Sequence, residues 1–134
     1  MSQKLVQIAL VIDDYDKAIA YYTQKLKFQL LEDTRLSESK RWVVIAPQAD
    51  AGCRILLAKA ANEEQAGRIG NQTGGRVFLF LHTDDIEGDY RNLIVNRVKI
   101  KREPTTEVYG KVLVFEDIYG NLWDLIEPDS LSFR

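Results

Sequence analysis

Residues 119–128 have the sequence Tyr-Gly-Asn-Leu-Trp-Asp-Leu-Ile-Glu-Pro, and this stretch decides the fold. Its Tyr-Gly-Asn start indicates a turn, because Gly and Asn tolerate a positive φ, and the aromatic and branched residues that follow favour a strand. Residues two apart in a strand share a face, so Asp124 points the same way as Leu122 and Ile126, and Trp123 points the other way. A charge on a buried face needs a partner, a metal or a ligand. What Asp124 faces is therefore the first functional question.

The bulk numbers indicate one globular domain. The chain has 134 residues, of which 46% are hydrophobic and 28% charged, and a chain of this length buries a substantial core without disulfides or metals. The net charge of −2 gives no electrostatic reason to expect nucleic acid or an anionic membrane as a partner. No apolar run approaches the roughly 20 residues of a membrane-spanning helix, and the start Met1-Ser2-Gln3-Lys4 predicts no signal peptide.

Cysteine and histidine are scarce. Cys53 is the only cysteine and His82 the only histidine, so the chain has no internal disulfide. A structural Cys/His zinc site is excluded, because it needs about four such ligands. A lone thiol fits a reducing compartment, and we expect a cytoplasmic protein.

The first half of the chain predicts a strand, a helix and three further strands. Asp13-Asp14 offers an N-cap for the helix, whose apolar residues recur at helical spacing. The predicted ranges are a strand at 5–12, a helix at 15–26, strands at 28–36, 41–46 and 54–58, and a turn at 47–52.

Residues 59–75 interrupt this rhythm. Asn62 caps a short helix, and the Asn-Gln-Thr-Gly-Gly run at 71–75 is a flexible polar linker. The segment is either a lid over a site or a connection between two halves.

The second half predicts the same order of elements. Asp84-Asp85 caps a helix, and Pro104 either ends a strand or places that strand at a sheet edge. The inner face of the helix is expected to carry Ile86, Tyr90, Leu93 and Ile94. The predicted strands are at 76–83, 98–102, 111–115 and 122–128.

Two sequence matches indicate an internal repeat. Residues 11–16 match residues 82–87 at an offset of 71, and residues 51–57 match residues 119–125 at an offset of 68. Two copies of a unit that cannot bury its own open face pack together around a pseudo-two-fold axis. We therefore expect the α+β class, as one domain with two βαβββ modules at about 4–60 and 76–128 and a linker at 61–75.

The two βαβββ halves, the Asp-Asp start of each helix and the Tyr-Gly-Asn-Leu-Trp-Asp-Leu run resemble the vicinal oxygen chelate superfamily. This superfamily includes glyoxalase I, extradiol dioxygenases, fosfomycin-resistance enzymes and bleomycin-resistance proteins. The resemblance covers nearly the whole chain, and its motifs are more specific for the fold than for the reaction. It implies a U-shaped mixed sheet around a ligand cavity, often within a homodimer.

The resemblance also implies where a metal would be held. Metal-dependent members take ligands from the first and fourth strand of each half, six residues before the double-Asp cap and four residues after the Gly turn. In this sequence those positions are Gln7, Leu56, Phe78 and Asp124. Leu56 and Phe78 cannot bind a metal ion, and a divalent ion is usually held by at least three oxygen or nitrogen ligands. We therefore expect no cofactor; the alternative is a divalent ion (Ni, Zn, Fe or Mn) held by Gln7, Asp124 and His82.

The predicted cavity is mostly apolar with a few polar groups, as small-molecule sites usually are. Arg54 and Asp124 occupy neighbouring positions by the repeat, and form either a structural ion pair or a pair that orients a polar ligand group. His82 is the candidate catalytic residue, because its pKa class suits a general acid or base near neutral pH. The expected lining is Gln7, Ala9, Arg54, Leu56, Phe78, Phe80, His82, Leu122 and Asp124.

Three functions from different classes follow. The first is a metal-free, small-molecule-binding protein of the bleomycin-resistance kind. The second is a glyoxalase-like, metal-dependent lyase, isomerase or dioxygenase with a reduced metal site. The third is an interaction or regulatory module with a vestigial cavity. We expect the first, with a small-molecule ligand as partner and a homodimeric assembly.

Overall fold

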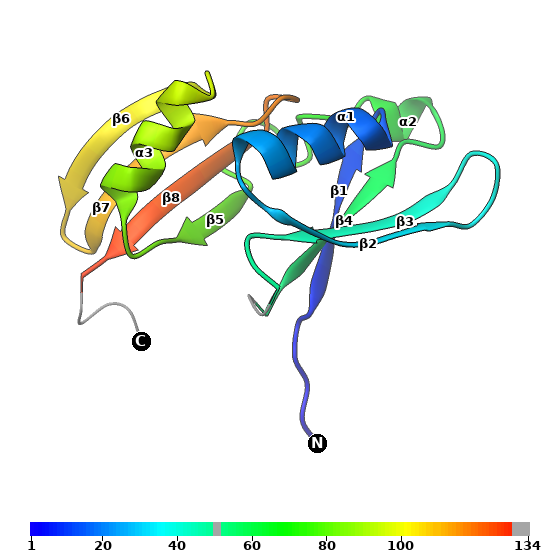
Figure 1. Cartoon of the computed structure of the whole chain (residues 1–134), viewed down its shortest axis with the longest axis horizontal. Coiled ribbons are helices and arrows are strands. Elements are labelled where there is room, and N and C mark those ends of the chain that lie inside the picture. The colour runs from blue at the N-terminus through cyan, green and yellow to red at the C-terminus, as the bar shows by residue number, and fades with distance from the viewer. Residues whose placement is uncertain (50–51, 130–134) are drawn as a thin grey trace. The chain divides into compact units, whose positions relative to one another are not determined.

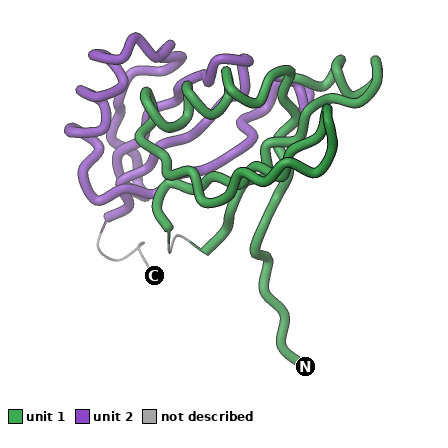
Figure 2. Tube along the Cα trace, turned by 45° about the vertical axis from the view of Figure 1, so that its right-hand side comes forward, with its two compact units in different colours: residues 1–69 green, residues 70–134 purple. Residues whose placement is uncertain are grey.

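The chain is described by a computed structural model over residues 1–49 and 52–129, which contains two four-stranded mixed sheets with a few helices (Figure 1). It divides into two compact units, Met1–Ile69 and Gly70–Arg134, coloured separately in Figure 2. The boundary falls inside the predicted linker at 61–75. Each unit has its own sheet with the same strand order, which confirms the α+β class and the two βαβββ modules.

The first unit has the strand order β1-β4-β3-β2, with β1 parallel to β4 and the other pairs antiparallel. Its elements are β1 (Gln7–Ile12), α1 (Tyr15–Ala20), η1 (Tyr21–Lys25), β2 (Gln29–Arg35), β3 (Arg41–Ala46), β4 (Arg54–Lys59) and α2 (Glu63–Ala66). The helix predicted at 15–26 changes form after Ala20, where η1 is a π-helical turn. Periodicity along the sequence did not reveal this change, because a five-residue π-helical stretch is about one turn long. Residues 50 and 51 of the turn predicted at 47–52 lie outside the described residues.

The core of the first unit lies between its sheet and α1, which contacts β3 and β4. Leu10 and Ile12 of β1 and Leu57 of β4 are fully buried on this side. Residues of opposite parity, such as Gln7 and Ala9, lie on the other side of the sheet. Helix α1 packs on the opposite side, and the side that carries Gln7 and Ala9 is called the open face here.

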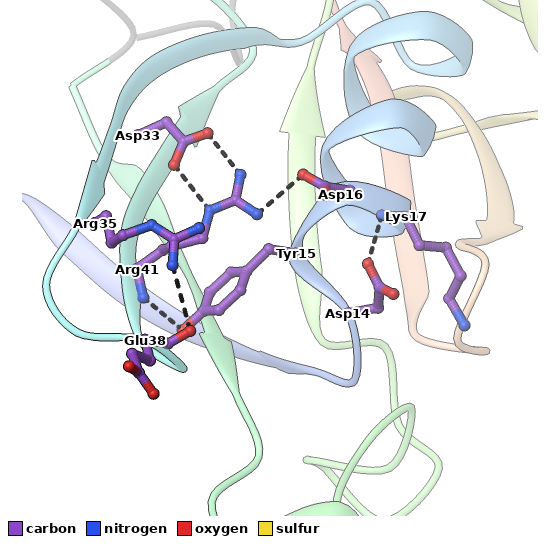
Figure 3. A network of polar contacts seen from close by, with 8 residues as sticks. All are labelled: Asp14, Tyr15, Asp16, Lys17, Asp33, Arg35, Glu38 and Arg41. Atoms are coloured by element: carbon purple, nitrogen blue, oxygen red, sulfur yellow. Dashed lines mark hydrogen bonds and ion pairs between the residues drawn. The ribbon is translucent and has the colours of Figure 1, made fainter.

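A polar network fastens β2 and β3 to α1 (Figure 3). Arg41 binds Asp33 through two hydrogen bonds, of 3.0 Å from Nε and 2.7 Å from Nη2, and its Nη1 donates to Asp16 at 2.9 Å. The guanidinium lies over the ring of Tyr15, 5.1 Å from the centroid, and the Arg41 backbone N–H donates to the Tyr15 hydroxyl. The hydrogen bonds from Arg41 lower the pKa of Asp33. One side chain therefore joins two strands and a helix.

The second unit has the strand order β5-β8-β7-β6, with β5 parallel to β8. Its elements are β5 (Leu79–His82), α3 (Ile86–Val95), β6 (Lys99–Glu107), β7 (Gly110–Glu116) and β8 (Leu122–Pro128). Strand β5 is shorter than the predicted 76–83. Of the two predicted roles of Pro104, the end of a strand is wrong, because β6 continues through it. The alternative is confirmed, because β6 is an edge strand whose register shifts between Arg102 and Thr105.

Helix α3 covers one face of the second sheet, where it contacts β6 and β8 (Figure 1). Trp123 is 1% exposed and stacks on Phe115 with ring centroids 5.8 Å apart. The alternating burial along β8 agrees with the prediction that Trp123 and Asp124 lie on opposite faces. Ile86 and Leu93 are buried as expected. The prediction for Ile94 is wrong: it is 50% exposed. It directly follows Leu93, and one helical step turns a side chain by about 100°.

Matching caps and turns support the repeat. Asp14 Oδ1 accepts a hydrogen bond from the Lys17 backbone N–H, and Asp85 Oδ1 accepts one from Gly88, at the predicted offset of 71. Gly52 and Gly120, at the offset of 68, both have a positive φ, of 93° and 97°. The local signals at the helix starts and before the fourth strands were therefore informative.

The turn between β7 and β8 is built on a buried carboxylate, Asp117. Its Oδ1 accepts from the backbone N–H groups of Tyr119 and Asn121, at 2.9 and 3.0 Å. Its Oδ2 accepts from Asn121 Nδ2 at 2.8 Å and lies 3.5 Å from Trp123 Nε1. The charge is thus satisfied by donors and does not need a cation.

We predict that Arg41→Gln lowers the free energy of unfolding by about 1–3 kcal/mol, since it removes the paired hydrogen bonds to Asp33. Asp16→Asn is the control, because Asp16 is 85% exposed and its single contact is worth little. Urea unfolding of both variants measures the difference. Equal losses of unfolding free energy in the two variants would show that the hydrogen bonds between Arg41 and Asp33 do not stabilise the fold more than the contact with Asp16.

Candidate functional site

In the second sheet, the open face is the one that α3 does not cover. This face carries most of the predicted site residues of the unit. Strand pairing sets Phe80 beside Asp124, Asp124 beside Val114, and Val114 beside Arg102, which forms one row across all four strands. In the next row, Leu122 is paired with Glu116, and the Phe78 backbone N–H donates to the Leu122 carbonyl at 2.9 Å. His82 pairs with Ile126 on the other side of the Phe80 row. The expected grouping of Leu122, Asp124 and Ile126 on one face agrees with this register.

Asp124 is half-buried in this row, beside an aromatic ring that is open to solvent. Phe80 is 63% exposed, a large value for an aromatic side chain in a strand. Burial raises the pKa of the Asp124 carboxyl, and the positive charge of Arg102 opposes that shift in part. Arg102 is itself bound to Glu107, with Nη2 2.7 Å from Oε1, and to the Thr105 hydroxyl. Burial therefore destabilises the charged form of Asp124, and its neighbours in the sheet do not fully offset this effect.

The first unit carries the other four predicted lining residues, Gln7, Ala9, Arg54 and Leu56. Gln7 is paired with Arg54, and Leu56 with Ala9 and Val44, so Gln7, Arg54 and Leu56 share the open face of that sheet. Arg54 is exposed, whereas Gln7 and Leu56 are half-buried. The predicted ion pair between Arg54 and Asp124 joins residues of different units and stays a prediction.

A pocket of about 210 Å³ lies where the 70–76 segment meets the second sheet. We call it the loop pocket. Phe78 and Leu122 form part of its wall, so it borders the open face. Its lining consists of Gly70, Thr73, Gly75, Arg76, Phe78, Lys101, Glu116, Gly120, Asn121 and Leu122.

Glu116 is the acidic group of the loop pocket. Its carboxylate is 16% exposed, and Oε2 lies 3.4 Å from the ammonium groups of both Lys99 and Lys101. Two cations on the edge strand β6 therefore share one carboxylate on β7. The local charge is more positive than the net charge of the chain would suggest.

Two of the four residues at the positions that the resemblance assigns to metal ligands are apolar. Leu56 and Phe78 offer no donor atom, which leaves one neutral amide, Gln7, and one carboxylate, Asp124. Within either unit, the residues that the structure describes bring no three His, Cys, Asp or Glu side chains together as metal ligands. His82 shares a face with Asp124 but lies in the adjacent row and is exposed. The donor set thus lacks the ligands that a divalent ion usually needs.

Sequence reasoning missed Arg102, Glu116 and the 70–76 segment as parts of the site. Arg102 and Glu116 reach it across strand pairs, and periodicity along one strand does not reveal its neighbours. The glycines at 70, 74 and 75 were a signal for unusual backbone, and all three have a positive φ. That signal was interpreted as a linker or a lid. Residues of the described 70–76 segment also form part of a pocket wall.

Comparison with known proteins identifies the family. The family model "Glyoxalase/Bleomycin resistance protein/Dioxygenase superfamily" matches residues 4–125. The chain therefore belongs to this superfamily, as the resemblance predicted. A protein of Shewanella frigidimarina (strain NCIMB 400) is 54% identical over 128 residues, which are 95% of each chain. YurT of Bacillus subtilis (strain 168) is 27% identical over 127 residues, 92% of this chain and 98% of YurT.

Solved structures have the same fold. UcmS2 superposes with a TM-score of 0.83 at 26% identity, over 95% of this chain and 99% of UcmS2. TnmS3, an antibiotic binding protein from Streptomyces sp. CB03234, superposes with a TM-score of 0.76 at 24% identity, over 96% and 98% of the two chains. No helix in the described part of the chain is long and apolar enough to cross a membrane.

The raised pKa of Asp124 predicts a pH dependence of stability. The unfolded carboxyl titrates near 3.8 and the folded one above it, so the folded state binds the proton more tightly. Stability from this group therefore increases as the pH falls through the folded-state pKa, and levels off below 3.8. We expect Asp124→Asn to be more stable than the wild type at neutral pH, and Arg102→Gln to raise the pKa of Asp124 further.

Carboxyl-detected NMR titration and urea unfolding measure these effects. Asp33 is the internal control with the opposite sign, because the hydrogen bonds from Arg41 lower its pKa. Its contribution is lost as the pH falls below the unfolded value. A folded-state pKa of Asp124 at or below 3.8 would contradict the assignment.

Proposed function

We propose that this protein binds a small organic molecule reversibly at the open faces of its sheets, without a catalytic metal. The observation that carries the proposal is the exposed ring of Phe80 beside the half-buried carboxylate of Asp124. An exposed aromatic side chain offers a stacking surface, and a desolvated carboxylate gains when a cationic group pairs with it. The expected ligand is therefore flat, aromatic and cationic.

The residues at the metal-ligand positions support binding over metal chemistry. Leu56 and Phe78 replace two of the four ligands of metal-dependent members, and an apolar wall of this kind suits a hydrophobic ligand. The fold itself is compatible with such a role, since TnmS3, an antibiotic binding protein, has it too. We propose a bleomycin-resistance-like binder rather than an enzyme on these grounds.

The second candidate is a glyoxalase-like lyase, isomerase or dioxygenase with a reduced metal site. It is favoured by one observation, the position of His82 and Asp124 on the same face of two paired strands. In that case Gln7 and Asp124 would hold the ion, His82 or a water would complete its shell, and the ion would supply Lewis-acid chemistry.

We also propose a homodimer in the cytoplasm. Ile94 and Val95, adjacent residues at the end of α3, are 50% and 79% exposed. Contiguous exposed apolar side chains are typical of protein interfaces. The single cysteine supports the compartment.

A thermal-shift screen with flat aromatic cations and neutral aromatic analogues tests the binding proposal. We expect some cationic compounds to raise Tm, and Phe80→Ala to weaken their binding by about tenfold, since stacking contributes about 0.5–1.5 kcal/mol beyond the area buried. Val95→Ala removes an exposed apolar side chain from α3 and should bind normally. Equal binding by Phe80→Ala and the wild type would place the ligand elsewhere.

Metal content separates the two candidates. Elemental mass spectrometry is done on protein purified without chelators or a His-tag, before and after soaking with nickel, cobalt, zinc, manganese and ferrous iron. We expect no near-stoichiometric metal, because the donor set is incomplete. Near-stoichiometric metal that is lost in Asp124→Ala would overturn the metal-free proposal and favour the enzyme.

A further inference from the structure

We infer that the loop pocket is an anion site, which binds a carboxylate or phosphate group carried on a small apolar body. The inference is separate from the proposed function, because it depends on Arg76 and Lys101 rather than on Phe80 and Asp124, and on a ligand group of opposite charge. It rests on the charge, the size and the rigidity of the pocket.

Arg76 supplies the charge for the anion. Its guanidinium is exposed at the pocket, and within the described part of its unit it has no ion-pair partner. A guanidinium presents a planar fork of donors that matches the two oxygens of a carboxylate or phosphate. The side chain is therefore available for an acidic group in the pocket.

Lys101 adds a second cation, whose ammonium group is positioned by an ion pair with Glu116. Its ammonium group is held near Glu116, whose other neighbour is Lys99, so the three side chains carry a net positive charge. Together with Arg76, the pocket and its edge therefore carry three cations, Arg76, Lys99 and Lys101, around one anion, Glu116. The second carboxylate nearby, Asp117, turns its oxygens toward the N–H groups of its own turn and the Asn121 amide. The pocket thus favours a negative ligand although the chain has a net charge of −2.

The pocket fits a small group. Its volume of about 210 Å³ lies below the roughly 300–1,000 Å³ of sites for drug-sized ligands. Phe78 and Leu122 supply the apolar part of its wall. A phenyl-sized body with one acidic group matches this combination.

The wall made by residues 70–76 is held in place. A Cβ on Gly70 would collide with the carbonyl oxygen of Tyr119, so only glycine permits this close approach to the β7–β8 turn. The Thr73 hydroxyl donates to the Arg76 carbonyl at 2.6 Å, which fixes the backbone that carries the guanidinium. A site whose walls are already ordered loses less entropy on binding.

Titration of ¹⁵N-labelled protein with benzoate, phenyl phosphate and neutral benzamide tests the inference. We expect saturable shifts at residues 70–78, 101 and 116–122 with at least one of the two anions. Arg76→Gln should weaken that binding by about tenfold or more, as expected for loss of a charge-assisted bidentate contact. Saturation by benzoate alone assigns a carboxylate ligand, by phenyl phosphate alone a phosphate, and by both the shared anion chemistry.

Arg97→Gln is the matched control, because it removes the same charge from an exposed arginine of the same unit outside the pocket. It should bind the anions like the wild type. Equal binding of benzamide, equal binding by Arg76→Gln, or no saturation by either anion at about 10 mM, a Kd too weak to matter, would overturn the inference. None of these outcomes touches the open-face proposal, whose ligands are cationic and respond to Phe80→Ala.

Discussion

The second sheet depends on the hydrogen bonds of one buried carboxylate, Asp117. Its two oxygens hold the backbone N–H groups of Tyr119 and Asn121 and the Asn121 amide, and β8 starts at the next residue, Leu122. The turn therefore fixes where β8 enters the sheet. A slip of one residue would exchange the two faces of the strand. Trp123 would leave the core and Asp124 would enter it, so one turn determines both the stability of the unit and the chemistry of its open face.

The first unit reaches the same topology through different polar contacts. At the offset of 68, the positions of Asp117 and Asn121 correspond to Ala49 and Cys53, which cannot form the same network. The first unit instead has the Arg41 network, in which one guanidinium joins β3 to β2 and α1 (Figure 3). The two units thus share their strand order and the alternation of buried and exposed residues along the strands. The polar contacts that hold the elements together differ between the units. For this reason the two open faces carry different side chains.

Much of the fold followed from local signals in the sequence. The Asp-Asp caps, the glycine turns and the parity of β8 were predicted, because each depends on residues that are neighbours along the chain. Contacts between strands were harder to predict. The shifts in register around Arg102 change which residue lies beside Val114, and no pattern along β6 shows them. Glu116 was missed for the same reason, because it reaches the site through the pairing of β7 with β8. The U-shaped arrangement and the pair of Arg54 with Asp124 depend on how the modules pack, and they stay predictions.

The two proposed sites of the second unit favour ligand groups of opposite charge. Asp124 and Phe80 favour an aromatic cation, whereas Arg76 and Lys101 favour an anion. Both sites use the same face of β8, since Leu122 belongs to the loop pocket and lies two residues before Asp124. Two residues along a strand span about 7 Å, so a single molecule reaching from one site to the other would need separated charges of both signs. A ligand with one charge would occupy one site and leave the other open. Competition between benzoate and an aromatic cation therefore distinguishes one zwitterionic ligand site from two independent ones: independent sites bind both probes together, without a change in either affinity.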